Sequence, residues 1–92
     1  MYAPGKYRVV QLGPEPGYSE NRWVDVPGDC DDLEDLLEMV FYYGQNDVQN
    51  VPGKRSVSVG DFVEVNGELY CCESNGWYNV ATGSYVLESL GS

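Results

Sequence analysis

Hydrophobic residues in the middle of the chain recur at the spacing of a helix. They fall on one stripe of an ideal helix and comprise Leu33, Leu36, Leu37, Val40 and Phe41. Such a stripe is typical of an amphipathic helix that buries one side against the rest of the protein. Asp29 or Asp31 can cap its start, and Gly44 is a residue type that commonly follows a helix end. The pattern predicts one helix over about residues 31–43.

Two segments before the helix have the character of strands. Residues 7–12 are apolar and rich in β-branched side chains, and residues 22–26 alternate polar with apolar positions. Segments containing Pro and Gly follow both runs and interrupt them. We therefore expect one or two N-terminal strands, and we expect residues 48–55 to form a loop.

The C-terminal half contains three turn signals between segments rich in Val, Tyr, Leu and Cys. They are Asn66-Gly67, Asn75-Gly76 and Thr82-Gly83. Asn-Gly between hydrophobic runs is a strong signal for a two-residue hairpin loop. The succession predicts a four-stranded antiparallel meander over about residues 57–88.

Two-residue loops also predict the register of this meander. Phe62 is expected opposite Cys71, and Cys71 opposite Val80. The third turn sets Val80 opposite Tyr85, so one apolar row crosses all four strands. We expect the helix to cover the face with this row, which holds Phe62, Leu69, Cys71, Val80 and Leu87. Cys71 should then be buried.

The opposite face of the meander is also more apolar than a solvated face requires. It carries Val63, Val65, Tyr70, Cys72, Trp77, Asn79 and Val86. Two explanations stay open. Either the N-terminal strands curl over this face and close the sheet, which removes exposed edges, or the face is an aromatic patch for a partner.

The predicted fold class is therefore α+β. One amphipathic helix packs on an antiparallel meander of about four C-terminal strands, joined by one or two N-terminal strands, with a partly closed small barrel as one outcome. A chain of 92 residues can build one core, so we expect a single small acidic domain over residues 1–92.

The charge of the chain narrows the class of partner. Fifteen Asp and Glu against five Lys and Arg give a formal net charge of −10. This field repels nucleic acid and anionic lipid and attracts basic protein surfaces. No long apolar run or signal-peptide pattern occurs, so we expect a cytoplasmic protein with no direct nucleic-acid or membrane contact.

The residue types present offer little chemistry. The chain has three cysteines and no histidine, whereas zinc sites usually need four Cys or His ligands and the common nucleophilic triads need a histidine. The carboxylates of residues 29–38 lack the spacing of a calcium-binding loop. We expect no catalytic residue, no metal and no cofactor.

Several segments resemble one family. They are Leu33 to Leu37, Tyr43-Gly44-Gln45-Asn46-Asp47, Ser56-Val57-Ser58-Val59-Gly60-Asp61 and the turn Asn75-Gly76-Trp77. Over about the last 60 residues the chain is similar to a YodL-like module among the small accessory proteins of actinobacterial phages and plasmids. The resemblance implies a mobile-element origin and an intracellular setting in a bacterial host, and it assigns no activity to any residue.

Two functional hypotheses follow. In the first, the protein binds and modulates or inhibits a basic host protein through acidic residues that imitate nucleic-acid phosphates, namely Asp31, Asp32, Glu34, Asp35 and Glu38. In the second, it is an interaction module that is acidic only for solubility and binds through Tyr42, Tyr43, Trp77 and Tyr78. A solvated, capped helix face also explains the acids, and the oligomeric state stays open.

Overall fold

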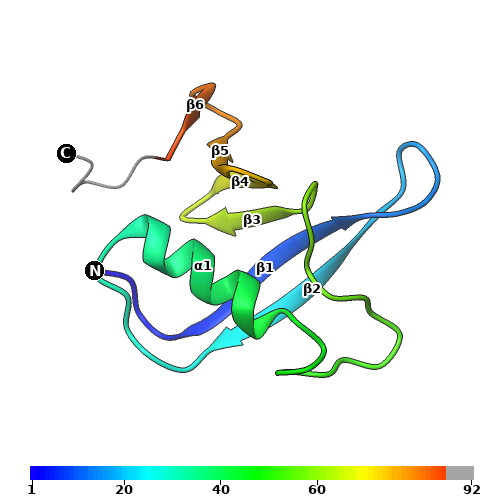
Figure 1. The fold of residues 1–92 in the computed structure, drawn as a ribbon, viewed down its shortest axis with the longest axis horizontal. Coiled ribbons are helices and arrows are strands. Elements are labelled where there is room, and N and C mark those ends of the chain that lie inside the picture. The colour runs from blue at the N-terminus through cyan, green and yellow to red at the C-terminus, as the bar shows by residue number, and fades with distance from the viewer. Residues whose placement is uncertain (87–92) are drawn as a thin grey trace.

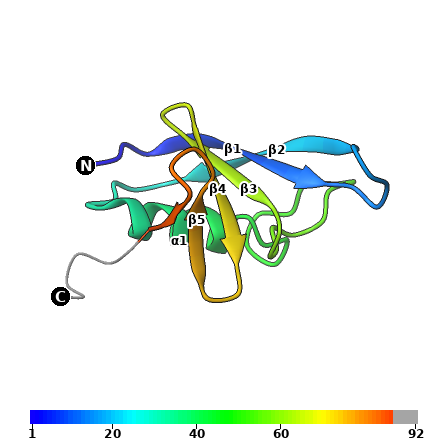
Figure 2. The same ribbon diagram turned by 90° about the horizontal axis from the view of Figure 1, so that it is seen from above.

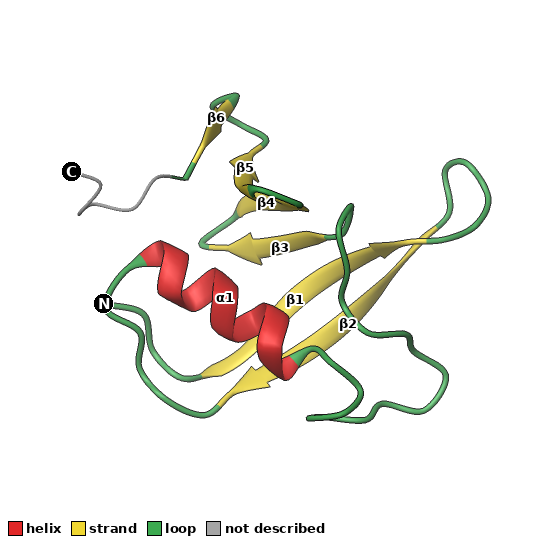
Figure 3. Cartoon of the chain, in the orientation of Figure 1, coloured by secondary structure: helices red, strands yellow, loops and turns green. Residues whose placement is uncertain are grey.

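Hydrogen bonding joins six strands into one antiparallel sheet in the computed structural model, which describes residues 1–86. Along the chain the elements are β1 (Gly5–Leu12), β2 (Ser19–Val26), α1 (Leu33–Tyr43), β3 (Phe62–Val65), β4 (Glu68–Glu73), β5 (Gly76–Asn79) and β6 (Ser84–Tyr85). The strand order is β2-β1-β3-β4-β5-β6, and the sheet is not closed into a barrel. α1 lies on one face of it (Figures 1, 2 and 3). The predicted α+β fold is confirmed.

The N-terminal hairpin extends the meander instead of curling over it. β1 pairs with β3 through Val9 opposite Val63 and Val10 opposite Phe62. Directly paired residues share a face, so the face of Val63 continues onto β1 at Val9. Closure by the N-terminal strands, one of the two explanations considered above, does not occur.

The Asn66-Gly67 turn gives the predicted register. Asn66 has φ of 51° and Gly67 has φ of 84°, the positive values that the tight two-residue loop requires. Phe62 consequently pairs with Cys71, as expected from the sequence.

The second turn differs from the prediction by two residues. Gly76 adopts φ of 146°, which favours glycine, and it opens β5 opposite Glu73 instead of closing the turn. Cys71 therefore lies opposite Tyr78 and not opposite Val80. A shift of two residues keeps every side chain on its predicted side of the sheet.

The third turn is longer than the predicted two residues. The Asn79 Oδ1 accepts hydrogen bonds from the backbone N–H groups of Ala81 and Thr82, at 2.9 and 3.1 Å. This local turn ends β5 and delays the start of β6, so Tyr85 lies opposite Tyr78. The predicted pairing of Val80 with Tyr85 is wrong, again by two residues.

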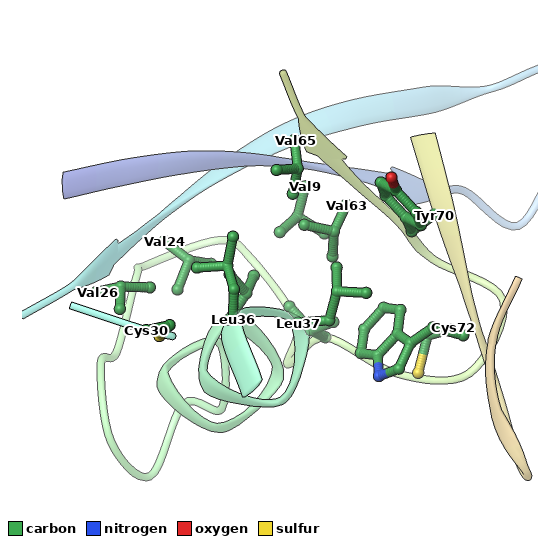
Figure 4. Packing of buried hydrophobic residues seen from close by; sticks show 13 residues of the cluster. Val9, Val24, Val26, Cys30, Leu36, Leu37, Val63, Val65, Tyr70 and Cys72 are labelled. Atoms are coloured by element: carbon green, nitrogen blue, oxygen red, sulfur yellow. The ribbon is translucent and has the colours of Figure 1, made fainter. Parts of the chain in front are cut away.

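α1 packs on the face opposite to the predicted one. Its partners on the sheet are buried and comprise Val9, Val24, Val26, Val63, Val65, Tyr70, Cys72 and Trp77 (Figure 4). On the other face, Phe62, Leu69 and Cys71 are half-buried and Val80 is exposed. The prediction of a buried Cys71 is wrong, and Leu87 lies outside the described residues.

The N-terminal strands explain this choice of face. Val24 and Val26 on β2 continue the aliphatic surface that Val9 and Val63 form across β1 and β3. The opposite side of the same hairpin carries Lys6, Arg8, Asn21, Trp23 and Asp25. Covering that side with a helix would bury charged groups at a large desolvation cost.

The leucine stripe of α1 packs as the sequence predicts. Leu36, Leu37 and Val40 are fully buried, while Leu33 and Phe41 are partly buried against the core. The N-cap, however, is Asp32 and neither Asp29 nor Asp31. Its carboxylate accepts a hydrogen bond from the Asp35 N–H at 2.9 Å, which satisfies a free donor of the first turn.

Gly44 follows the helix at a position that leaves no room for a side chain. Its φ of −81° is open to any residue, yet a Cβ at this position would lie 2.4 Å from Val57 Cγ2 and 2.9 Å from Val40 O. The exit glycine predicted from the sequence is present, and it allows residue 57 to approach the last turn of α1.

Side-chain amides fasten the long loop after α1. Gln45 Nε2 donates to Phe41 O and Val57 O, both at 2.9 Å. Asn46 Nδ2 donates to Lys54 O at 2.8 Å. These bonds connect the residues that follow the helix to the segment that leads into β3.

A buried arginine ties the same loop to the sheet. Arg22 on β2 is 2% exposed, and its guanidinium donates to Asn46 Oδ1, Arg55 O and Gln49 O. All three acceptors are uncharged, and burial lowers the pKa of Arg22 from its ordinary value.

Gln49 binds the outer edge of β2. Its Oε1 accepts from the Asp25 N–H at 3.2 Å, and its Nε2 donates to Asp25 O at 2.6 Å. One side-chain amide therefore forms the two bonds that the backbone of a further strand would form with this residue.

Candidate functional site

The solvent side of α1 mixes carboxylates with large apolar side chains. Asp35 and Glu38 are exposed there, Met39 is 43% exposed and Tyr42 is 55% exposed. Asp31 and Asp32 are exposed directly before the helix. We refer to this set as the outer helix surface, consisting of Asp31, Asp32, Asp35, Glu38, Met39 and Tyr42.

The part of the chain that contains α1 and its flanking loops carries exclusively negative side-chain charge. Between Trp23 and Gly53 the chain has eight acidic residues and no Lys or Arg. Within the described residues, three of the five cations form ion pairs on the sheet and its loops: Arg8 with Glu64, Lys54 with Glu20 and Arg55 with Asp61. A fourth, Arg22, is buried. The fifth, Lys6, lies on β1 opposite Asp25 of β2. Four of the five basic residues are therefore ion-paired or buried on the sheet and its loops.

The carboxylates at the start of α1 affect the pKa of a buried thiol, that of Cys30. The thiol is buried next to the start of α1, and burial raises its pKa. The negative charges of Asp35, Asp29, Asp31 and Asp32 raise the pKa further. The charges of four carboxylates thus act on one buried side chain at this end of the helix.

Glu38 and Trp77, predicted for two different surfaces, are bonded to each other. Trp77 Nε1 donates to Glu38 Oε2 at 2.9 Å, and the Trp77 side chain is 2% exposed beneath α1. Phe41 packs edge-on against the Trp77 ring at a centroid distance of 6.5 Å. Trp77 is a core residue, and its prediction as an exposed partner-binding residue is wrong.

The four predicted aromatic residues do not form one surface. Tyr42 and Tyr43 are in edge-to-face contact at 4.9 Å on α1. Tyr78 alternates with Trp77 along β5, so it lies on the uncovered face of the sheet, where it contacts Tyr85 at 5.3 Å. Trp77 and Tyr78 consequently face opposite sides of the sheet.

Of the predicted acidic residues, Glu34 is the least accessible. Its side chain is half-buried, whereas Asp31, Asp32, Asp35 and Glu38 are exposed. Met39 was absent from the sequence-based prediction. It lies four residues after Asp35, so helical periodicity could have placed it next to Asp35 on the same exposed side of the helix.

The described cysteines are poor nucleophiles. Burial raises the pKa of Cys71 and raises that of Cys72 to about 11, with smaller contributions from neighbouring negative charges. A raised pKa lowers the fraction of reactive thiolate at neutral pH. Within residues 1–86, no group of three or more Cys, Asp or Glu side chains is placed to hold a metal ion.

Among the described residues, hollows beside α1 include the following two. One, of about 230 Å³, lies over Trp77 and includes Glu38, Phe41 and Val59 in its lining. The other, of about 260 Å³, lies where the end of β2 meets the helix, and its lining includes Cys30 and Met39. A third hollow, of about 450 Å³, lies away from the helix at the β1–β2 loop.

Comparison of the chain with protein-family models, with curated proteins and with solved structures gave no match. In the part of the chain that the structure describes, no helix combines the length and apolar character needed to cross a lipid bilayer.

Proposed function

We propose that the protein is a non-catalytic accessory protein of a phage or other mobile element. It binds a host protein that has a basic surface, in the cytoplasm of the bacterial host, and thereby modulates or inhibits that protein. The outer helix surface makes the contact, and its carboxylates occupy positions that nucleic-acid phosphates take in a basic groove.

The observation that carries this proposal is the concentration of carboxylates beside exposed apolar side chains. Asp31 and Asp35 supply charge, while Met39 and Tyr42 supply contact area on the same side of α1. Opposite charges steer the encounter and set the register of two proteins, and buried aromatic or methionine side chains contribute most of the affinity.

The absence of catalysis in this proposal rests on the residue types and their pKa values. The chain has no histidine, and burial holds the Cys72 thiol at a pKa of about 11. The chain therefore has no histidine to act as a general base, and Cys72 is not an activated nucleophile.

Charge reversal on the outer helix surface tests the proposal. Asp31→Lys combined with Asp35→Lys should weaken binding to a partner recovered from host lysate by at least about tenfold, since each lost contact between close opposite charges costs on the order of 1 kcal/mol. Glu38 is left unchanged because its replacement would remove the hydrogen-bond acceptor of Trp77.

The matched control reverses two exposed acids elsewhere. Glu15→Lys combined with Asp47→Lys changes the net charge equally, on the β1–β2 loop and on the loop after α1. Binding of the wild type should weaken between about 0.1 M and 1 M salt, because the Debye length falls from about 10 Å to 3 Å. Equal affinities for both double variants would remove the outer helix surface from the mechanism.

The alternative, an interaction module that binds through aromatic residues, has support from a different surface. The uncovered face of the sheet carries Trp23 at 55% exposure and Tyr85 at 45% exposure, beside the half-buried Phe62 and Tyr78. Binding through these residues should be nearly insensitive to salt and to both charge reversals, which distinguishes it from the main proposal.

A further inference from the structure

The hollow at the end of β2 has a mainly apolar lining next to the outer helix surface. It measures about 260 Å³ and is lined by Val26, Pro27, Gly28, Asp29, Cys30, Met39 and Tyr43. The lining comes from β2, from the segment between β2 and α1, and from one side of the helix. Of the lining residues, Val26 and Cys30 are buried and belong to the same hydrophobic cluster as Leu36 (Figure 4).

The size of this hollow indicates what can occupy it. Pockets for drug-sized ligands usually enclose about 300–1,000 Å³, whereas a cavity of about 150 Å³ accommodates a benzene ring. The hollow therefore suits one large side chain better than a complete small ligand. Protein interfaces often place their most important contacts in such pockets, where one residue of the partner inserts.

The charges around the hollow indicate which residue types would flank the inserted side chain in the sequence of the partner. Asp29 is part of the lining, and Asp35 lies one helical turn before Met39. Asp31 and Asp32 lie close enough to Cys30 for their charges to act on its thiol. A segment entering the hollow therefore passes carboxylates, and lysine or arginine next to its apolar residue would be stabilised there.

We propose that this hollow receives one apolar side chain, most favourably an aromatic one, from a partner segment whose neighbouring residues are Lys or Arg. The inference rests on the proposed function and specifies it further, since it names the sequence character of the partner. The carboxylates bind the basic residues, and Met39 and Tyr43 contact the inserted side chain.

Two short synthetic peptides serve as probes. Both carry lysines on each side of a central position, which is phenylalanine in one peptide and alanine in the other. The phenylalanine peptide should bind at least about tenfold more tightly, equivalent to about 1.4 kcal/mol, because only its central side chain buries a large apolar area in the hollow. Fluorescence anisotropy of labelled peptides measures the difference.

The two methionines locate the binding. With ¹³C-methyl-labelled methionine, the Met39 resonance should shift strongly with the phenylalanine peptide and weakly with the alanine peptide. Met1 is 86% exposed and does not line the hollow, so its resonance should respond equally to both peptides.

Variants of the lining test the hollow directly. Gly28→Phe should remove the difference between the two peptides, since a Cβ at Gly28 meets no atom within 4 Å and the new ring can occupy the space. Met39→Glu should do the same by placing a charge at the apolar wall. Val59→Glu, at a residue that is 60% exposed and outside this lining, adds the same charge and should preserve the difference.

The outcomes separate this inference from the proposed function. Equal, salt-sensitive binding of both peptides would overturn the inference and leave the acidic surface in place. No binding of either peptide, together with no salt-sensitive partner in lysate, would contradict both. A dimer of this chain in sedimentation that shields Met39 and excludes the peptides would assign the hollow to a second copy and overturn the inference.

Discussion

The two faces of the sheet are similarly apolar in the C-terminal strands but differ sharply in the N-terminal hairpin. On the face that α1 covers, β1 and β2 contribute Val9, Val24 and Val26, each at most 1% exposed. On the other face the same strands contribute Arg8, which pairs with Glu64, and the exposed Trp23. Strands remote in sequence from the meander therefore determine which of its faces becomes the core.

The largest expected effect compares one core side chain with one from the uncovered face. Leu37→Ala should lower the free energy of unfolding by about 2–5 kcal/mol, because Leu37 is fully buried against the sheet. Phe62→Ala should cost clearly less, since Phe62 is half-buried and water can occupy part of the space. Urea denaturation of both variants gives the comparison, and equal losses would mean that the uncovered face is covered in solution.

Adjacent residues of β5 provide a second comparison. Trp77→Phe should cost about 2–4 kcal/mol, because it removes the hydrogen bond to Glu38 and leaves space beneath α1. Tyr78→Phe removes only a hydroxyl on the other face and should stay within about 0.5 kcal/mol of the wild type. Thermal unfolding measures both, and a larger loss for Tyr78→Phe would reverse the assignment of faces.

The third comparison involves no change in stability, since it uses the wild-type protein. It concerns the rates at which Cys71 and Cys72 are chemically labelled. Burial raises both pKa values, and that of Cys72, on the covered face, reaches about 11. At pH 8 the Cys72 thiolate fraction is then about a hundredfold below that of an ordinary thiol of pKa 9.0.

Iodoacetamide labelling followed by peptide mass spectrometry measures this difference. Cys71 should be modified first, and labelling of Cys72 should accelerate as pH rises toward its pKa. Faster modification of Cys72 at pH 8 would place it on the accessible side of β4 and contradict the covered face described above.

Local sequence signals predicted those features whose causes are local. The leucine stripe located α1, and Asn66-Gly67 gave the pairing of Phe62 with Cys71, because helix periodicity and turn conformation depend on neighbouring residues. The second turn deviated because Gly76, with φ of 146°, begins β5 instead of ending the loop. The third deviated because the Asn79 side chain bonds the backbone of a longer turn.

Features that depend on contacts between residues far apart in the sequence could not be predicted from the sequence pattern. The contact between Val9 and Val63 decides which face is buried, and the bond between Trp77 and Glu38 joins residues 39 positions apart. The hollow at Cys30 likewise combines the end of β2 with Met39 of α1. Asp31, Asp32, Asp35 and Glu38 are exposed as the sequence predicted, whereas Glu34 is half-buried. The positions of Trp77 and Tyr78 could not be predicted without knowing which face of the sheet α1 covers.

The side chain of Gln49 has a consequence for aggregation. β2 is an eight-residue edge strand, and such an edge offers free donors and acceptors to the strands of other molecules. The Gln49 amide occupies both backbone groups of Asp25, so a foreign strand adding to β2 meets an edge that is already closed at that residue. At the opposite margin β6 has only two residues, too few to template a ladder of any length. The chain thus limits intermolecular sheet growth at both margins, at one by a side-chain amide and at the other by a short strand.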